Sequence, residues 1–204
     1  MSTIKTTNIT HGSNSGTANI VLASDGTISI AKNPRRVLEQ FFTPCDGSTI
    51  ACANGDVTVQ DVTAIQAGTD TYTDVTGSVI SYNPPTGTTQ VIYEFWYQMG
   101  KDGNTNASAL IKLYLDSDEV TLGFCNQQTD TALRAYIKWG FNIGGSADTT
   151  HGRVASWSSA KTIKLQAREL ASNTQIMFHE TAASGDGSTT DIFVTPCIGI
   201  TAIG

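Results

Sequence analysis

Charge is scarce in this sequence. Only 15% of the 204 residues are Asp, Glu, Lys or Arg, and the 12 basic residues are scattered rather than clustered. The formal net charge of −6 gives no electrostatic attraction to a phosphate backbone. We therefore expect no nucleic-acid partner.

Long apolar runs are also absent. No stretch of about 18 consecutive apolar residues occurs, as a membrane-spanning helix would need. The first residues, MSTIKTTNITHGSNSG, contain no apolar stretch of the length found in signal peptides. We expect no membrane insertion and a chain that is made as a soluble protein in a cytoplasm.

Cysteines are few, and their spacing matches no paired metal-ligand motif. They are Cys45, Cys52, Cys125 and Cys197. The first two are separated by six residues and could close a small disulfide loop. They could equally be reduced, structural thiols, because the compartment decides the redox state more than the spacing does.

Motifs that carry catalysis are missing. None of the three histidines has a second histidine three or four residues away, as a zinc site would favour; they are His11, His151 and His179. In the predicted strand that contains Ile176 and Phe178, alternation turns His179 outward, so we expect it at the surface or at a subunit contact. No Gly-x-Ser-x-Gly elbow occurs. We expect neither an enzyme nor a bound metal or cofactor.

Two acidic stretches imitate functional sites without completing them. In DGNTNAS, Asp102, Asn104 and Asn106 occupy the first three ligand positions of a calcium loop. Ala107 replaces the loop glycine and Leu113 stands where a bidentate glutamate is required, so a hairpin turn is expected. In LDSDEV, the acidic residues directly follow a strand and indicate a solvated turn rather than two carboxylates facing each other across a glycan-hydrolysing cleft. These acidic residues are Asp116, Asp118 and Glu119.

What the sequence has in quantity is the composition of a β protein. Glycine numbers 19, and threonine and serine are abundant, which is typical of short strands joined by tight polar turns. Val91, Tyr93, Phe95, Tyr97 and Met99 alternate on one face of a strand, which predicts a core face. The other predicted strands are RVLEQFF, Ala107–Leu115, Leu133–Phe141, Ile163–Ala167, Ile176–Phe178 and Ile192–Ile203. We predict an all-β fold, an antiparallel two-sheet sandwich (jelly-roll-like) over residues 34–204.

Residues 1–33 differ from this domain and predict an extended N-terminal arm. Asn19–Leu22 and Thr27–Ile30 supply β-formers around Ser24-Asp25-Gly26, which indicates a hairpin. Pro34 cannot donate to a β-ladder, so we place the boundary there. A hairpin of this size is not stable alone and must lie against the domain, neighbouring arms or a larger assembly. The apolar residues that would anchor it are Ile4, Ile9, Ile20, Leu22, Ile28 and Ile30.

The strand segments, taken in order, resemble a known family. RVLEQFF, YTDVTGSVISYNPPTGTTQVIYEFWYQMG, ALIKLYLDSDEV and KTIKLQARELASNTQIMFHE are similar to a β-sandwich domain found in fibre and appendage proteins of tailed phages, especially marine ones. The resemblance covers residues 37–204, and the first 30 residues also look like the segment that attaches such a subunit to its particle. No coiled-coil heptads and no repeated shaft occur, so a tail knob, head fibre or decoration protein is as open as a tail fibre.

The resemblance implies a homotrimeric virion component, assembled in the host cytoplasm, whose arm binds other virion proteins. Trp96, Tyr114 and Tyr136 lie opposite the core faces of their strands, so they either contact a neighbouring subunit or merely cap sheet edges or pack under loops. Candidate loops for contact with a bacterial surface glycan are residues 104–108, 144–152 and 184–190, which include Asn104, Asn106, Asp148, His151 and Asp186.

Two other classes of function remain open. A cellular carbohydrate-binding module would also be a sandwich with exposed Trp and Tyr, although a free module does not need the arm. A glycan depolymerase would need a long cleft lined by several carboxylates, and the 18 acidic residues lie mostly in turns.

Overall fold

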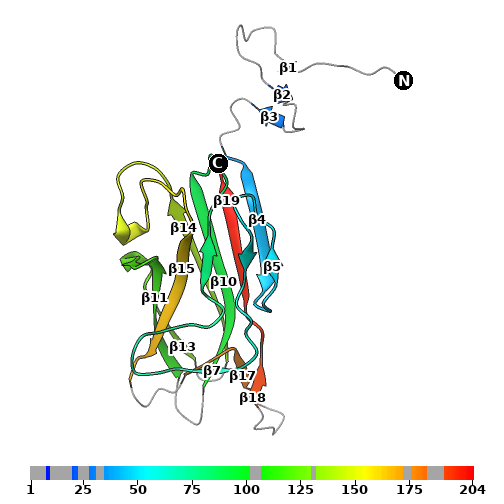
Figure 1. The fold of residues 1–204 in the computed structure, drawn as a ribbon. Coiled ribbons are helices and arrows are strands. Elements are labelled where there is room, and N and C mark those ends of the chain that lie inside the picture. Colours follow the sequence, from blue (N-terminus) through cyan, green and yellow to red (C-terminus); the bar gives the residue numbers. More distant parts are fainter. Residues whose placement is uncertain are drawn as a thin grey trace, which may run out of the picture. The chain divides into compact units, whose positions relative to one another are not determined.

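The computed structural model describes residues 8–9, 20–22, 28–30, 35–101, 107–129, 132–171, 176–182 and 191–204. The chain divides into two units, residues 1–36 and 37–204. In the first unit, three short strands form an antiparallel sheet: β1 (Asn8–Ile9), β2 (Ile20–Leu22) and β3 (Ile28–Ile30) (Figure 1). The pairing of β2 with β3 is the predicted hairpin. The predicted turn residues 24–26, together with Ile4, lie outside the described residues.

The second unit consists of two antiparallel sheets that pack face to face (Figure 1), which confirms the predicted sandwich. In the first sheet, β10 lies between β14 on one side and β19 and β16 on the other, with β4 beyond β19 and β7 beyond β16. These strands are β4 (Val37–Pro44), β7 (Gln66–Ala67), β10 (Gln90–Lys101), β14 (Leu133–Asn142), β16 (Ile176–Phe178) and β19 (Cys197–Ile203).

The second sheet is built around two long strands. β11 and β15 pair with each other; β12 and β13 lie beyond β11, and β8 and β9 lie beyond β15. The bounds are β8 (Thr73–Asp74), β9 (Ile80–Tyr82), β11 (Ala107–Leu115), β12 (Asp118–Glu119), β13 (Cys125–Thr129) and β15 (Lys161–Glu169). The remaining elements are β5 (Thr49–Ile50) with β6 (Val57–Thr58), β17 (Glu180–Ala182) with β18 (Asp191–Phe193), and the 3-10 turns η1 (Thr121–Gly123) and η2 (Thr149–His151).

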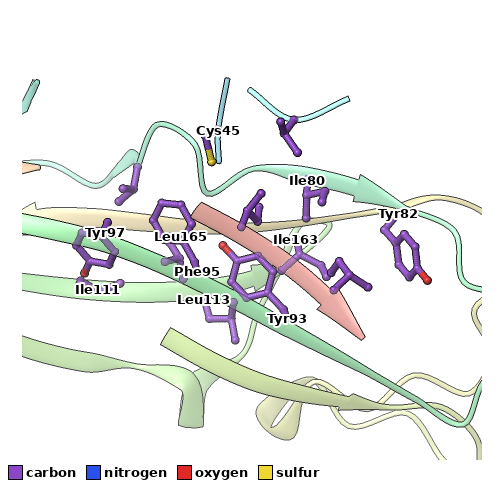
Figure 2. Close-up of a cluster of buried hydrophobic side chains, with 14 of the residues drawn as sticks. Cys45, Ile80, Tyr82, Tyr93, Phe95, Tyr97, Ile111, Leu113, Ile163 and Leu165 are labelled. Atoms are coloured by element: carbon purple, nitrogen blue, oxygen red, sulfur yellow. The ribbon is translucent and has the colours of Figure 1, made fainter. Parts of the chain in front are cut away.

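The core between the sheets follows the predicted alternation. All five residues of the predicted core face of β10, Val91 to Met99 in steps of two, are fully buried. Figure 2 shows Tyr93, Phe95 and Tyr97 of this face among Ile111 and Leu113 of β11 and side chains of β15 and β9. Residues on opposite inner faces thus cover each other, and the hydrophobic effect holds the two sheets together.

Tyrosines in this core keep their hydroxyl groups hydrogen-bonded. Tyr93 Oη donates to the Ser78 carbonyl at 2.8 Å, and Tyr97 Oη donates to Gln127 Oε1 at 2.6 Å. Burial raises the pKa of both phenols well above its usual range, so they remain neutral donors. A buried hydroxyl group without a hydrogen-bond partner destabilises the folded state. Alternation alone predicts a large apolar residue at these two positions, and the hydrogen bonds allow a tyrosine there instead.

The predicted strand Ile192–Ile203 is wrong as a single strand. β18 ends at Phe193 and β19 begins at Cys197, with Pro196 between them. Proline has no amide hydrogen to give to a ladder, and the Pro196 carbonyl instead accepts a bond from the Cys45 amide at 2.9 Å. The two halves therefore join different sheets: β18 pairs with β17, and β19 lies between β4 and β10.

The prediction of a surface position for His179 is also wrong, because this residue is fully buried. It follows β16 and has a left-handed φ of 64°. This conformation interrupts the two-residue alternation, so Phe178 and His179 can both point inward. His179 packs among the rings of Phe95, Tyr97 and Phe178, and its Nε2 lies 3.0 Å from Thr76 Oγ1.

Candidate functional site

The outer face of the first sheet carries a cluster of large apolar side chains. Phe42 and Tyr136 are 57% and 48% exposed, and Ile92 and Trp96 are half-buried. Trp96 stands directly opposite Tyr136 in the β10–β14 ladder. We call these four residues the aromatic face. An apolar cluster of this kind on a sheet is typical of a contact surface rather than of a solvated one.

A glycine shapes this face. Gly199 of β19 pairs with Phe42 of β4 on one side and with Glu94 of β10 on the other. A Cβ atom at Gly199 would lie 2.5 Å from Phe42 Cδ2, which is far inside van der Waals contact. The missing side chain therefore lets the Phe42 ring lie over β19.

The charged side chains next to the aromatic face have partners on the same side of the sheet. Glu94 accepts a hydrogen bond from Tyr136 Oη and lies 2.9 Å from Lys138 Nζ. Burial opposes ionisation of Glu94, but these two hydrogen bonds hold its pKa below the ordinary value. The Arg134 guanidinium lies 5.7 Å from the centre of the Trp96 ring. Because Glu94 already has its partners, a surface that covers the face need not supply a counter-charge for it.

The outer face of the second sheet is different. Tyr114 of β11 lies there, with Lys164 Nζ at 5.9 Å from its ring centre. Ion pairs cross this face at 2.7 Å between Lys112 and Glu119 and at 2.9 Å between Lys164 and Asp74. The structure thus brings Trp96 and Tyr136 together and places Tyr114 on the opposite side of the sandwich, so one flat partner surface cannot contact all three.

The strand ends that flank the candidate contact loops lie at both ends of the sandwich. At one end, Val37 at the start of β4 and Gln90 at the start of β10 both pair with Ile203. Residues 144–152 follow β14 at this end, since Asn142 also pairs with Gln90. At the other end, Lys101 at the end of β10 pairs with Ile176, and the strand ends that flank residues 102–106 and 183–190 lie here (Figure 1). Asn104, Asn106 and Asp186 themselves lie outside the described residues.

Asp148 and His151 form a local pair. His151 Nδ1 lies 2.6 Å from Asp148 Oδ2, and this hydrogen bond holds the pKa of Asp148 below its usual value. The backbones of Asp148 and Arg153 also bond to each other, at 2.9 Å in both directions. The loop that carries these two residues is therefore held by its own contacts.

Several ionisable side chains in the part of the chain that the structure describes lie in structural pairs rather than in metal-binding groups. No group of three His, Cys, Asp or Glu side chains there could hold a metal ion, and no helix there has the length and apolar character to span a membrane. Asp116 pairs with Lys161 at 2.7 Å and accepts the Thr162 amide at 2.8 Å, which is a turn-stabilising role. All four cysteines are free thiols, and burial raises the pKa of Cys45 to about 12, so this thiol stays protonated.

Comparisons with known proteins give distant similarities only. No protein-family model and no curated protein sequence matches the chain. Three chains from structures of infectious bursal disease virus are similar to it. They come from the Gx strain (9% identity, TM-score 0.29, covering 87% of this chain and 43% of that one), the VP2 subviral particle (9%, 0.30, 86% and 42%) and the Gt strain (10%, 0.25, 77% and 47%). This chain spans less than half of each, and we draw no functional conclusion from them.

Proposed function

We propose that this protein is a non-enzymatic structural subunit of a phage particle, a fibre, knob or decoration protein that forms trimers. The observation that supports this most is the aromatic face, where Phe42 and Tyr136 expose about half of their surface next to Trp96. In a monomer such a face invites non-specific association, whereas in a trimer it is covered. The resemblance of residues 37–204 to phage appendage domains supports the same proposal.

The topology of the sandwich supports different roles for its two ends. Residues 1–36 are joined to the sandwich at Val37, where β4 begins. At the opposite end are the strand ends that flank residues 102–106 and 183–190. In our proposal the N-terminal unit binds other virion proteins and the opposite end is displayed toward the bacterial surface. Three copies held at one position on the particle can bind the surface at the same time, so weak individual contacts add up through avidity.

We expect the purified protein to be a trimer in solution. Light scattering at micromolar concentration should give a mass of about three times the 21.6 kDa of one chain. Replacing Phe42 by Ser, which removes an exposed ring, should shift the equilibrium toward monomers, whereas Leu122→Ser removes an equally exposed side chain from η1 and should not. A monodisperse 21.6 kDa species from the unmodified chain would contradict the trimer.

Removing residues 1–30 should leave a folded sandwich that no longer joins the particle. Residues 37–204 form a compact unit by themselves, so we expect them to fold when residues 1–30 are removed. Circular dichroism should show the same β signal for both forms, while mass spectrometry of purified virions should find only the full chain. An unfolded truncated chain would mean that residues 1–30 belong to the core, and a truncated chain found in virions at normal copy number would refute the anchoring role.

A further inference from the structure

Two adjoining hollows lie where β9 ends and β15 begins. They have volumes of about 350 Å³ and 310 Å³ and are lined mainly by residues 54–58, 81, 83–88, 155–158 and 160. Asn54 and Asn83 line both of them, so the two hollows form one groove with two amide side chains at its centre. We call it the polar groove. Its size falls at the lower end of the range of about 300–1,000 Å³ that is usual for ligand sites.

The lining of the polar groove has few ionisable groups and many hydrogen-bonding groups. Asp56 is the one ionisable side chain among its described lining residues, and most of the others are Asn, Ser, Thr or Pro. Amide and hydroxyl groups both donate and accept, as the hydroxyl groups of a sugar do. Because its described lining contains no Lys or Arg, the groove has no cationic side chain to pair with a phosphate or carboxylate ligand.

The walls of the groove are fixed by contacts behind them. Trp157 is only 7% exposed; its Nε1 donates to the Tyr82 carbonyl at 3.0 Å, and its ring meets Phe141 edge to face at 6.1 Å. In addition, Asn54 Nδ2 donates to the Pro84 carbonyl at 2.6 Å. A site that is already in place before binding loses little conformational entropy when a ligand enters.

Asn83 has a buried acceptor that lacks a partner. Its Oδ1 makes no hydrogen bond with any described residue. Buried polar atoms are nearly always hydrogen-bonded, and each exception calls for an explanation such as a ligand or a water. A hydroxyl group entering from either hollow, with a small rotation of the amide, would supply the missing donor.

We propose that the polar groove binds a neutral oligosaccharide, with the Asn54 and Asn83 amides bonding its hydroxyl groups and Asp56 accepting bonds from neighbouring hydroxyls. A peptide fits this lining less well, because the groove has neither a broad apolar floor for a helix nor an Arg cluster for an acidic motif. The groove includes none of the candidate contact loops, so oligosaccharide binding there is separate from the proposed role in a virion.

Titration calorimetry on the purified full chain tests this. The probes are cellopentaose, maltopentaose, mannopentaose and chitopentaose, with an oligogalacturonate as the acidic counterpart and a Ser- and Asn-rich peptide as the third class. We expect at least one neutral probe to bind. Ser158→Trp, which fills the groove, should weaken that binding at least about tenfold. Ser159→Trp is the matched control, because Ser159 is also exposed on the same segment but does not line the groove, and it should leave the affinity unchanged.

A second pair of variants keeps the test decisive if the tryptophan affects folding. Asn83→Leu keeps nearly the shape of the side chain but removes its Oδ1 acceptor and its amide donor, and should also weaken binding. Asn126→Leu makes the same change at an exposed position of β13 and should not. The proposal is overturned if no neutral probe binds at millimolar concentration, if only the acidic probe or the peptide binds, or if groove and control variants behave alike. Virion incorporation is measured separately, so failure here leaves the proposed function standing.

Discussion

Replacing Phe95 by alanine should lower the free energy of unfolding by ~3–5 kcal/mol, the range for deleting a large buried aromatic side chain. Phe95 is fully buried, stacks on Tyr97 with ring centres 5.2 Å apart and meets the His179 ring edge to face. Because a domain has only about 5–15 kcal/mol in total, this one change removes a large share of the stability. Urea melts should show the loss at every protein concentration, since the cavity forms inside one subunit.

Trp96 is the neighbouring residue and the matched comparison. It lies on the aromatic face, half-buried and opposite Tyr136. In a trimer built through this face, Trp96→Ala should lower stability more at low protein concentration than at high concentration, because the change weakens association. A loss as large as that of Phe95→Ala and independent of concentration would show that Trp96 supports the fold of one subunit, and the face would lose its role in assembly.

Acidification from pH 7 to pH 4 should destabilise the protein by up to about 3 kcal/mol through His179 alone. Desolvation by burial lowers the pKa of His179 from 6.5 to about 4. Its Nδ1 makes no hydrogen bond with the described residues, so a second ring proton would have no acceptor there. Above pH 6.5 the imidazole of His179 is neutral in both the folded and the unfolded state, so its protonation does not lower the free energy of unfolding. Between pH 6.5 and about 4 only the unfolded state takes up the proton, so stability falls as pH falls.

The variant that isolates this effect is His179→Asn, because asparagine tolerates the left-handed φ of 64° at this position. Its unfolding free energy, measured by urea melts at several pH values, should be nearly flat between pH 6.5 and 4.5. His151→Asn is the control, since His151 is exposed, and it should keep the slope of the unmodified protein. A slope that survives in His179→Asn would mean that another group causes it and would contradict the role of His179.

The alternation of β10 could be predicted from sequence because it depends on local geometry alone. Strand side chains point to opposite faces in turn, and Val91 to Met99 follow this rule without a break. The rule failed where the backbone departs from the extended form. His179 has a positive φ, and Pro196 interrupts a run that is apolar on both sides. Proline at 196 was a visible signal for the second failure, whereas nothing near His179 in the sequence indicates the left-handed turn.

Contacts between distant segments were beyond sequence reasoning. Periodicity predicts that Tyr114 and Trp96 both point away from the core. It does not predict that their strands, β11 and β10, belong to different sheets. The outward position of Phe42 could be predicted, because alternation in RVLEQFF places it on the face opposite to Phe41. The polar groove joins Asn54, Asn83 and Trp157, which are far apart in the chain and form no motif. Only the fold brings them together.

The position of β19 has a consequence for biosynthesis. This strand lies between β4 and β10, yet in chain order it follows every other described strand. While the ribosome is still making residues 101–196, β4 has no neighbour on the side that β19 will occupy, and one edge of β10 stays largely open. An open edge of this kind can pair with a second nascent chain. Folding of the sandwich is therefore completed late, and a chain that stops short of residue 197 lacks a central strand.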